Sequence, residues 1–81
     1  MRIRLLYFAS FRDAAGRDEE SRELAPGTTV GSLWASLAGE QPRFAAYRAM
    51  PAAAVNRVYA DASRKLDDGD EVAFLPPVAG G

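Results

Sequence analysis

The sequence contains no cysteine and no histidine, and Lys65 is its only lysine. Without thiolate or imidazole groups, the chain forms no disulfide and offers no zinc site of the usual kind. It also lacks the side chains that enzymes use most often as nucleophile and general base. If the protein takes part in chemistry, we therefore expect a partner to supply the catalytic groups, or the chain itself to be the substrate. We expect no bound metal and no bound cofactor.

Long apolar runs and a strong charge of either sign are also missing. No apolar segment approaches the roughly 20 residues that span a bilayer, so a membrane is not an expected partner. The first residues alternate polar and apolar side chains and do not resemble a secretory signal, which makes the cytoplasm the expected location. Ten basic residues face eleven acidic ones, and no basic stripe forms, so nucleic acid is not an expected partner either.

The 81 residues suffice for a single domain with a modest core. Apolar and polar side chains alternate over residues 2–8, which predicts a first strand. Shorter strands are expected at residues 21–24, 52–56, 58–60 and 71–75. We assign residues 1–75 to the folded domain and residues 76–81 to a flexible C-terminal tail that ends in Gly-Gly.

Helical spacing predicts one principal helix over residues 30–39. Its apolar side chains fall at i, i+3, i+4 and i+7 and are expected in the core: Val30, Leu33, Trp34 and Leu37. Thr28 and Thr29 can cap its first turn, and Gly39 is expected to end or loosen it. A shorter helix is expected from Phe11, capped by Ser10, and residues 41–49 are ambiguous.

The predicted order of elements places an antiparallel hairpin before the principal helix and a second hairpin after it. The expected fold is therefore α+β, a β-grasp, in which a mixed sheet carries the principal helix on one face. The first and last strands are neighbours in such a sheet. Turns are expected at Gly16, at Asn56-Arg57 and at the acidic run 67–70, because Gly and Asn tolerate positive φ.

Strand parity predicts an apolar patch on the face of the sheet that the helix leaves open. Arg2 and Arg4 face outward on the first strand, and Glu71 faces outward on the last one. The same faces continue into four apolar residues, Leu6, Phe8, Ala73 and Leu75. Such a patch suggests a protein interface, although the short segments at 10–15 or 41–49 could instead cover it.

The C-terminal tail consists of Pro76, Pro77, Val78, Ala79, Gly80 and Gly81. The two prolines cannot extend a strand ladder and favour a stiff, extended exit. The two glycines lack a Cβ, so their backbone can enter a narrow channel. The alternative interpretation of this tail is a disordered end or a domain boundary.

A family resemblance follows from several segments. Ala54-Val55-Asn56 and the run from Leu66 to Gly81, LDDGDEVAFLPPVAGG, resemble the small, sulfur-carrying subunit of molybdopterin synthase, of the MoaD type. The start of the chain at residues 6–12, LYFASFR, is similar too. The resemblance spans the chain, although residues 38–51 match little. It implies the ubiquitin-like β-grasp family.

The resemblance also implies a function for Gly81. An ATP-dependent, ubiquitin-activating-like enzyme would adenylate its carboxylate, and a sulfur donor would convert the product to a thiocarboxylate. The tail would then insert into the large synthase subunit, which holds the catalytic groups, so the chain alone is no enzyme. Sulfur would pass to a cyclic pyranopterin precursor and build the molybdopterin dithiolene, within a heterotetramer. Family interface positions fall on Phe8, Tyr59 and Leu75.

Three alternatives stay open at this point. A sulfur carrier of the thiamine pathway shares the fold and the Gly-Gly end, but the Phe-Leu-Pro-Pro segment at 74–77 argues against it. A ubiquitin-like modifier would use the same activated terminus on lysines of target proteins. A non-covalent β-grasp adaptor would leave the tail inert. The acidic residues at 67–71 are either a solvated turn or a contact to a basic partner surface.

Overall fold

The computed structural model describes residues 1–47 and 49–76, so residues 77–81 of the predicted tail lie outside the described part. Five strands and three helices follow one another along the chain. They are β1 (Arg2–Tyr7), α1 (Ala9–Ala15), β2 (Glu19–Glu23), α2 (Val30–Glu40), α3 (Pro42–Ala45), β3 (Ala52–Val55), β4 (Val58–Ala60) and β5 (Glu71–Leu75). Across these described ranges, every helix is too short or too polar to cross a membrane.

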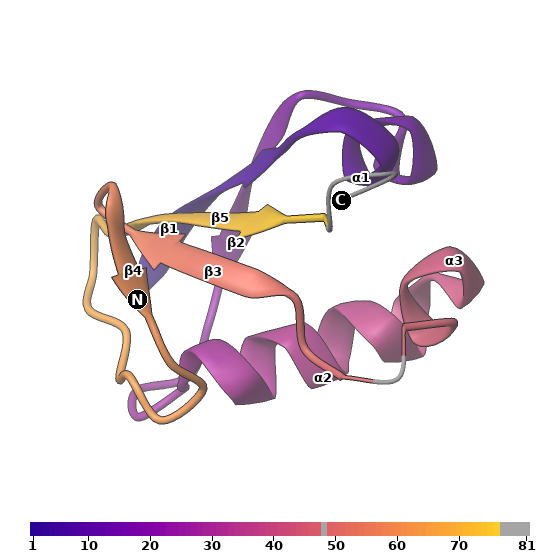
Figure 1. Ribbon diagram of the computed structural model, residues 1–81. Helices are drawn as coiled ribbons and strands as arrows, with labels where there is room; N and C mark the ends of the chain where they lie inside the picture. Colours follow the sequence, from indigo (N-terminus) through magenta and orange to yellow (C-terminus); the bar gives the residue numbers. More distant parts are fainter. Residues whose placement is uncertain (48, 77–81) are drawn as a thin grey trace.

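The five strands form one mixed sheet in the order β2-β1-β5-β3-β4. β1 and β5 are parallel, and the other neighbouring strands are antiparallel. Helices α2 and α3 lie on one side of this sheet, while α1 follows the end of β1 (Figure 1). The predicted α+β β-grasp arrangement, with its first and last strands side by side and one principal helix on one face, is confirmed.

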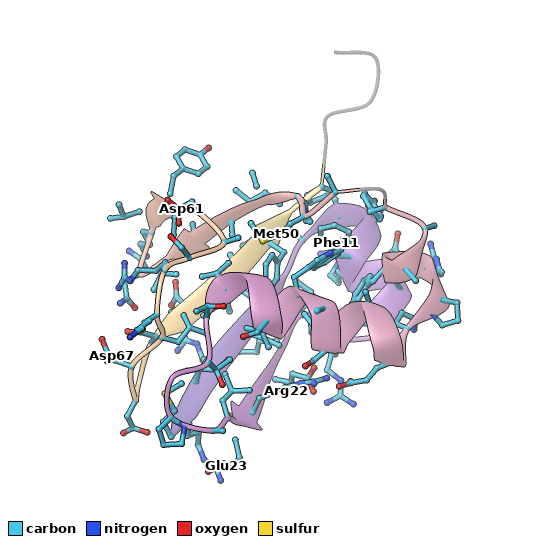
Figure 2. The ribbon with its side chains drawn as sticks, turned by 90° about the horizontal axis from the view of Figure 1, so that it is seen from below. Phe11, Arg22, Glu23, Met50, Asp61 and Asp67 are labelled. Atoms are coloured by element: carbon cyan, nitrogen blue, oxygen red, sulfur yellow. The ribbon has the colours of Figure 1, made fainter. Side chains whose placement is uncertain are left out.

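The core lies between the sheet and α2. Inward residues of the strands alternate with outward ones, and all four residues of the predicted helical stripe are buried. Phe11 contributes a ring 5.6 Å from Trp34, and Trp34 in turn lies 5.1 Å from Phe74, so an aromatic cluster joins α1, α2 and β5. In Figure 2, Phe11 lies in the interior, whereas Glu23, Asp61 and Asp67 lie at the periphery.

The ends of the principal helix differ in how well the sequence predicts them. Thr29 caps α2 as predicted: its side chain accepts a hydrogen bond from the backbone N–H of Ser32, and the Ser32 hydroxyl oxygen accepts one from the backbone N–H of Thr29. The helix does not end at Gly39 but continues to Glu40. Gln41 is the C-cap of α2 and the N-cap of α3, so the ambiguous region 41–49 contains a four-residue helix at Pro42–Ala45.

The prediction of Ser10 as the N-cap of the first helix is wrong. Phe8 occupies the N-cap position with extended backbone, and Ala9 turns into the helix with a φ of 48°. No side chain caps this helix, and the carbonyl of Phe8 accepts hydrogen bonds from the N–H groups of Phe11 and Arg12. The predicted left-handed cap at Gly16 is confirmed, with a φ of 76°.

Candidate protein interface

One row of side chains crosses four strands on the face that no helix covers. The pairing registers place Leu6 beside Ala73, Ala73 beside Ala54, and Ala54 beside Tyr59. Paired residues present their side chains on the same face of a sheet. The two central positions of this row, on β5 and β3, therefore form a low alanine floor between a leucine on β1 and a tyrosine on β4.

This floor is part of an apolar groove, a name we use for the depression lined by Leu6, Phe8, Ala54, Ala73 and Leu75, with Arg4, Arg57 and Glu71 at its polar end. Phe8 is 46% exposed and Tyr59 is 78% exposed, although both are large apolar side chains. Exposed apolar side chains gathered on one face are typical of a binding surface. The predicted patch thus forms as strand parity required.

The structure corrects one detail of the predicted patch and excludes one alternative to it. Ala73 lies on the open face but is only 8% exposed, because its methyl group is low and its neighbours Leu6 and Ala54 flank it. It can shape the floor of the groove but offers little contact area itself. The alternative that the segment at 10–15 covers the patch is excluded for Phe8, which stays nearly half exposed beside α1.

The polar end of the groove holds a chain of opposite charges. Arg4 pairs with Glu71 and, at 3.2 Å from its Nε, with Glu19. Glu71 also lies 3.8 Å from the Nε of Arg57, whose side chain is 90% exposed. The open face is therefore divided into a charged half near the start of β5 and an apolar half near its end.

The β3–β4 turn is fastened to the start of β5 by Asn56. Its Nδ2 donates to Asp70 at 2.9 Å, its Oδ1 accepts from the backbone N–H of Glu71 at 3.0 Å, and its own N–H donates to the Glu71 carbonyl at 2.8 Å. Asp70 is buried and also accepts from the N–H of Asp67 at 2.8 Å. The acidic run is thus not simply a solvated turn, because the buried carboxylate of Asp70 holds the surrounding loops together by hydrogen bonds.

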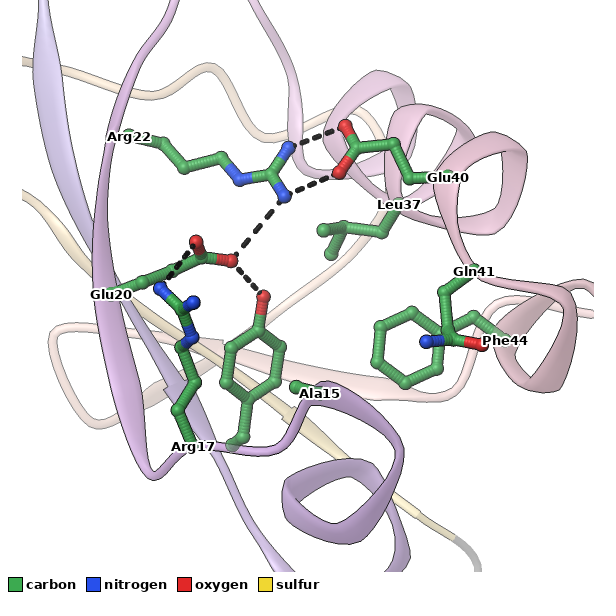
Figure 3. Close-up of a pocket in the computed structure, with 9 residues that line it drawn as sticks. Ala15, Arg17, Glu20, Arg22, Leu37, Glu40, Gln41 and Phe44 are labelled. Carbon is green, nitrogen blue, oxygen red and sulfur yellow. Dashed lines mark hydrogen bonds and ion pairs between the residues drawn. The ribbon is translucent and has the colours of Figure 1, made fainter.

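A second depression lies on the other face, at the rim of the core. Arg22 on β2 makes a bidentate pair with Glu40 at the end of α2, at 2.5 and 2.6 Å, and contacts Glu20 at 3.3 Å (Figure 3). The hydroxyl of Tyr7 donates to the same Glu20. The hydrogen bond from Arg22 lowers the pKa of Glu40.

This polar network joins β2 to β1 and to the end of α2. Burial, followed by the hydrogen bond to Glu20, raises the pKa of Tyr7, so the phenol keeps its proton and acts as a donor. The two carboxylates of the network, Glu20 and Glu40, are paired with arginines. Among residues 1–47 and 49–76, no acidic group of three or more is placed to hold a metal ion.

The structure thus collects the predicted interface residues on one face and adds two that the sequence did not reveal. Ala54 and Arg57 line the groove, but their place in it depends on the register between β3 and β5. Pro76, at the end of the described chain, is half-buried directly after the groove residue Leu75. The predicted sulfur-bearing residue Gly81 and the preceding tail residues 77–80 lie outside the described residues.

Comparison with known proteins covers nearly the whole sequence, including the residues that the structure does not describe. A model of the ThiS family matches residues 5–81. The molybdopterin synthase sulfur carrier subunit of Mycobacterium tuberculosis is 40% identical over 82 residues, which is 100% of this chain and 99% of that one. The structure of a putative molybdopterin converting factor, subunit 1, from Pyrococcus furiosus has a TM-score of 0.83 at 31% identity, over 96% of this chain and 99% of that one.

The same fold also occurs within an assembly. A complex of subunits 1 and 2 of the molybdopterin-converting factor from Helicobacter pylori contains a chain with a TM-score of 0.69 at 22% identity, matched over 100% of both chains. At this identity the likeness concerns the fold alone. It nevertheless shows that this fold is found in contact with a partner subunit.

Proposed function

The chain belongs to the ThiS family, and from this membership we propose that it is the sulfur carrier subunit of molybdopterin synthase. The observation that carries the proposal is the apolar groove at the end of β5, which leads directly into the segment that ends at Gly81. Gly81 is the sixth residue after Leu75, which gives it a reach of at most about 20 Å if the chain is extended. A partner bound over the groove can therefore receive the terminal carboxyl group in its own site.

The chemistry begins at the Gly81 carboxylate, which is a poor electrophile. An ATP-dependent, ubiquitin-activating-like enzyme converts it to an acyl-adenylate with release of pyrophosphate. A sulfur donor then delivers sulfide to the acyl carbon, where a C–S bond forms as AMP leaves with the electrons of the broken C–O bond, which yields a thiocarboxylate. The chain supplies no catalytic side chain to these steps, in keeping with its lack of cysteine and histidine.

The second stage is transfer of sulfur to a cyclic pyranopterin precursor. We place the large subunit of the synthase over the apolar groove, with the tail inserted into its active site, in a heterotetramer. Two transfers supply the two sulfur atoms of the dithiolene. Holding the thiocarboxylate beside the precursor makes each transfer effectively unimolecular. Because activation consumes ATP, we expect these steps in the cytoplasm.

Intact-mass measurement tests the proposal directly. Incubation with the activating enzyme, ATP and a sulfur source should replace one oxygen of the terminal carboxyl group by sulfur. A variant that lacks Gly81 should keep the melting temperature of the parent chain, because the described core ends at Leu75, and should acquire no sulfur. Sulfur loading of that variant would refute the role of Gly81.

The same assay separates the other candidate functions. Addition of the large subunit and the precursor should give molybdopterin, whereas thiazole formation with thiamine-pathway enzymes would indicate the thiamine-type carrier. Adducts on lysines of other proteins would indicate a modifier. An unchanged mass together with partner binding would indicate the non-covalent adaptor.

A further inference from the structure

Backbone strain in the described chain occurs beside its exposed apolar side chains. Within residues 1–47 and 49–76, the non-glycine residues with positive φ are Ala9 at 48°, Asn56 at 52° and Arg57 at 70°. Ala9 follows Phe8, and Arg57 precedes Val58 and Tyr59, which are the large apolar side chains that the fold leaves exposed. Residues with a Cβ avoid positive φ, and such strain tends to gather at functional sites.

Arg57 is the least expected of these residues. Asn56 and Arg57 form a two-residue turn between β3 and β4 with positive φ at both positions, the geometry of a type I′ turn. The second position of this turn favours glycine. An arginine there adds strain, and its 90% exposed side chain buries almost nothing in return.

The ion pair of Arg57 does not explain its presence either. The Nε lies 3.8 Å from Glu71, which is already paired with Arg4. Exposed pairs of this kind contribute little to stability, because water screens them and side-chain entropy opposes them. A residue that costs the fold stability and returns little is expected to serve a contact with another molecule.

The position of Arg57 is nevertheless well defined. The three hydrogen bonds of Asn56 to Asp70 and Glu71 fasten the turn to the start of β5. The side chain of Arg57 lines the polar end of the apolar groove, on the same face as Leu6 and Leu75. A partner that covers the groove would therefore meet an arginine whose backbone is held in place by its neighbour Asn56.

Resting on the proposed function, we propose that Arg57 is a specificity-determining residue that binds a carboxylate of the large subunit at the polar end of the groove. A guanidinium presents a planar fork of donors that matches a carboxylate and can bind it through two hydrogen bonds. Cover by the partner removes water from the pair and strengthens it. The complementary surface is thus apolar over Leu6 and Leu75 and acidic next to Arg57.

Three variants test this contact with the large subunit as the probe. Arg57→Gly removes the side chain and relieves the strained φ, so its melting temperature should rise. Its dissociation constant for the large subunit should increase about tenfold, because the partner carboxylate loses its counter-charge. Arg57→Lys keeps a positive charge but lacks the planar fork of donors. Its dissociation constant should lie between those of the parent chain and Arg57→Gly. Arg43→Ala removes the same charge from the exposed surface of α3 and should bind like the parent chain.

Salt dependence supplies a readout that a structural role would not change. Added salt should weaken binding of the parent chain more than binding of Arg57→Gly. Equal affinity and equal salt dependence of these two proteins would overturn the proposal, as would a similar loss in Arg43→Ala. A lower melting temperature of Arg57→Gly would show that Arg57 stabilises the fold, and would also overturn it. Failure of the parent chain itself to bind the large subunit would instead refute the proposed function.

Discussion

The two faces of the sheet use the same strands for different purposes. The covered face carries large side chains that pack against α2, with Phe74 and Val55 each 1% exposed. The open face carries alanines on β5 and β3, and its most exposed large side chains are Phe8, which lines the groove, and Tyr59, which lies beside Ala54 on β4. Neighbouring residues of one strand can therefore differ completely in role, since alternate side chains point to opposite faces.

The difference shows how a small domain can separate folding from recognition. Arg2 and Arg4 in the charged half of the open face have ion-pair partners within the fold, whereas the apolar half has no cover among the described residues. Loss of a side chain from the covered face should reduce stability, and loss of one from the apolar half should reduce partner binding. Adjacent residues on β5 allow this comparison to be tested directly.

The largest expected effect comes from Phe74→Ala. Removal of a fully buried ring that contacts Trp34 should lower the free energy of unfolding by about 3–5 kcal/mol, because a cavity remains in the core. Urea unfolding followed by tryptophan fluorescence measures this loss. Leu75→Ala, one residue along the strand, is the control and should cost much less. Equal losses would mean that the two faces contribute alike to folding.

A smaller effect, on binding rather than stability, is expected for Leu75→Glu. A carboxylate in the apolar half should raise the dissociation constant for the large subunit at least about tenfold, because it becomes desolvated without a partner. Titration calorimetry measures the affinity, and a thermal melt checks the fold. Ala35→Glu adds the same charge on the exposed side of α2 and should bind normally. Similar affinity losses in both variants would show that the added charge, and not the site, is responsible.

The smallest effect is expected for Tyr7→Phe, at the rim of the covered face. Loss of the hydrogen bond to Glu20 should cost about 1 kcal/mol near neutral pH, since two arginines still hold that carboxylate. Because the fold raises the pKa of Tyr7, the tyrosine contributes its full stabilisation below pH 10 and loses it as the pH rises further. Unfolding measured from pH 8 to pH 11 should show a steeper decline for the parent chain. Parallel pH profiles would contradict this role.

Much of the fold follows from sequence patterns. The helical stripe of α2, the Thr29 cap and the parity of β1 and β5 depend on local spacing, and the structure confirms them. The beginning of α1 was not predictable in this way, because Ala9 adopts a φ that alanine rarely takes. A sequence rule therefore selects the nearby Ser10 as the cap.

The candidate site was predictable only in part. Alternation identified Leu6, Phe8 and Leu75, because each continues a face that begins with a charged residue. The place of Arg57 and the burial of Ala73 depend on which strands are neighbours and in what register, which no local pattern reports. The role of the tail residues from Pro77 onward stays a prediction.

The parallel pairing of β1 and β5 has a practical consequence for work with this protein. Both strands run toward the groove, so Met1 lies at the opposite end of the sheet, where its amino group donates to the carbonyl of Leu24 at 3.0 Å. An affinity tag joined before Met1 keeps an N–H in that place and lies at the opposite end of the sheet from Leu75 and the tail. A tag joined after Gly81 would consume the carboxyl group that we propose is activated. Surface immobilisation and labelling should therefore begin from the amino-terminal side.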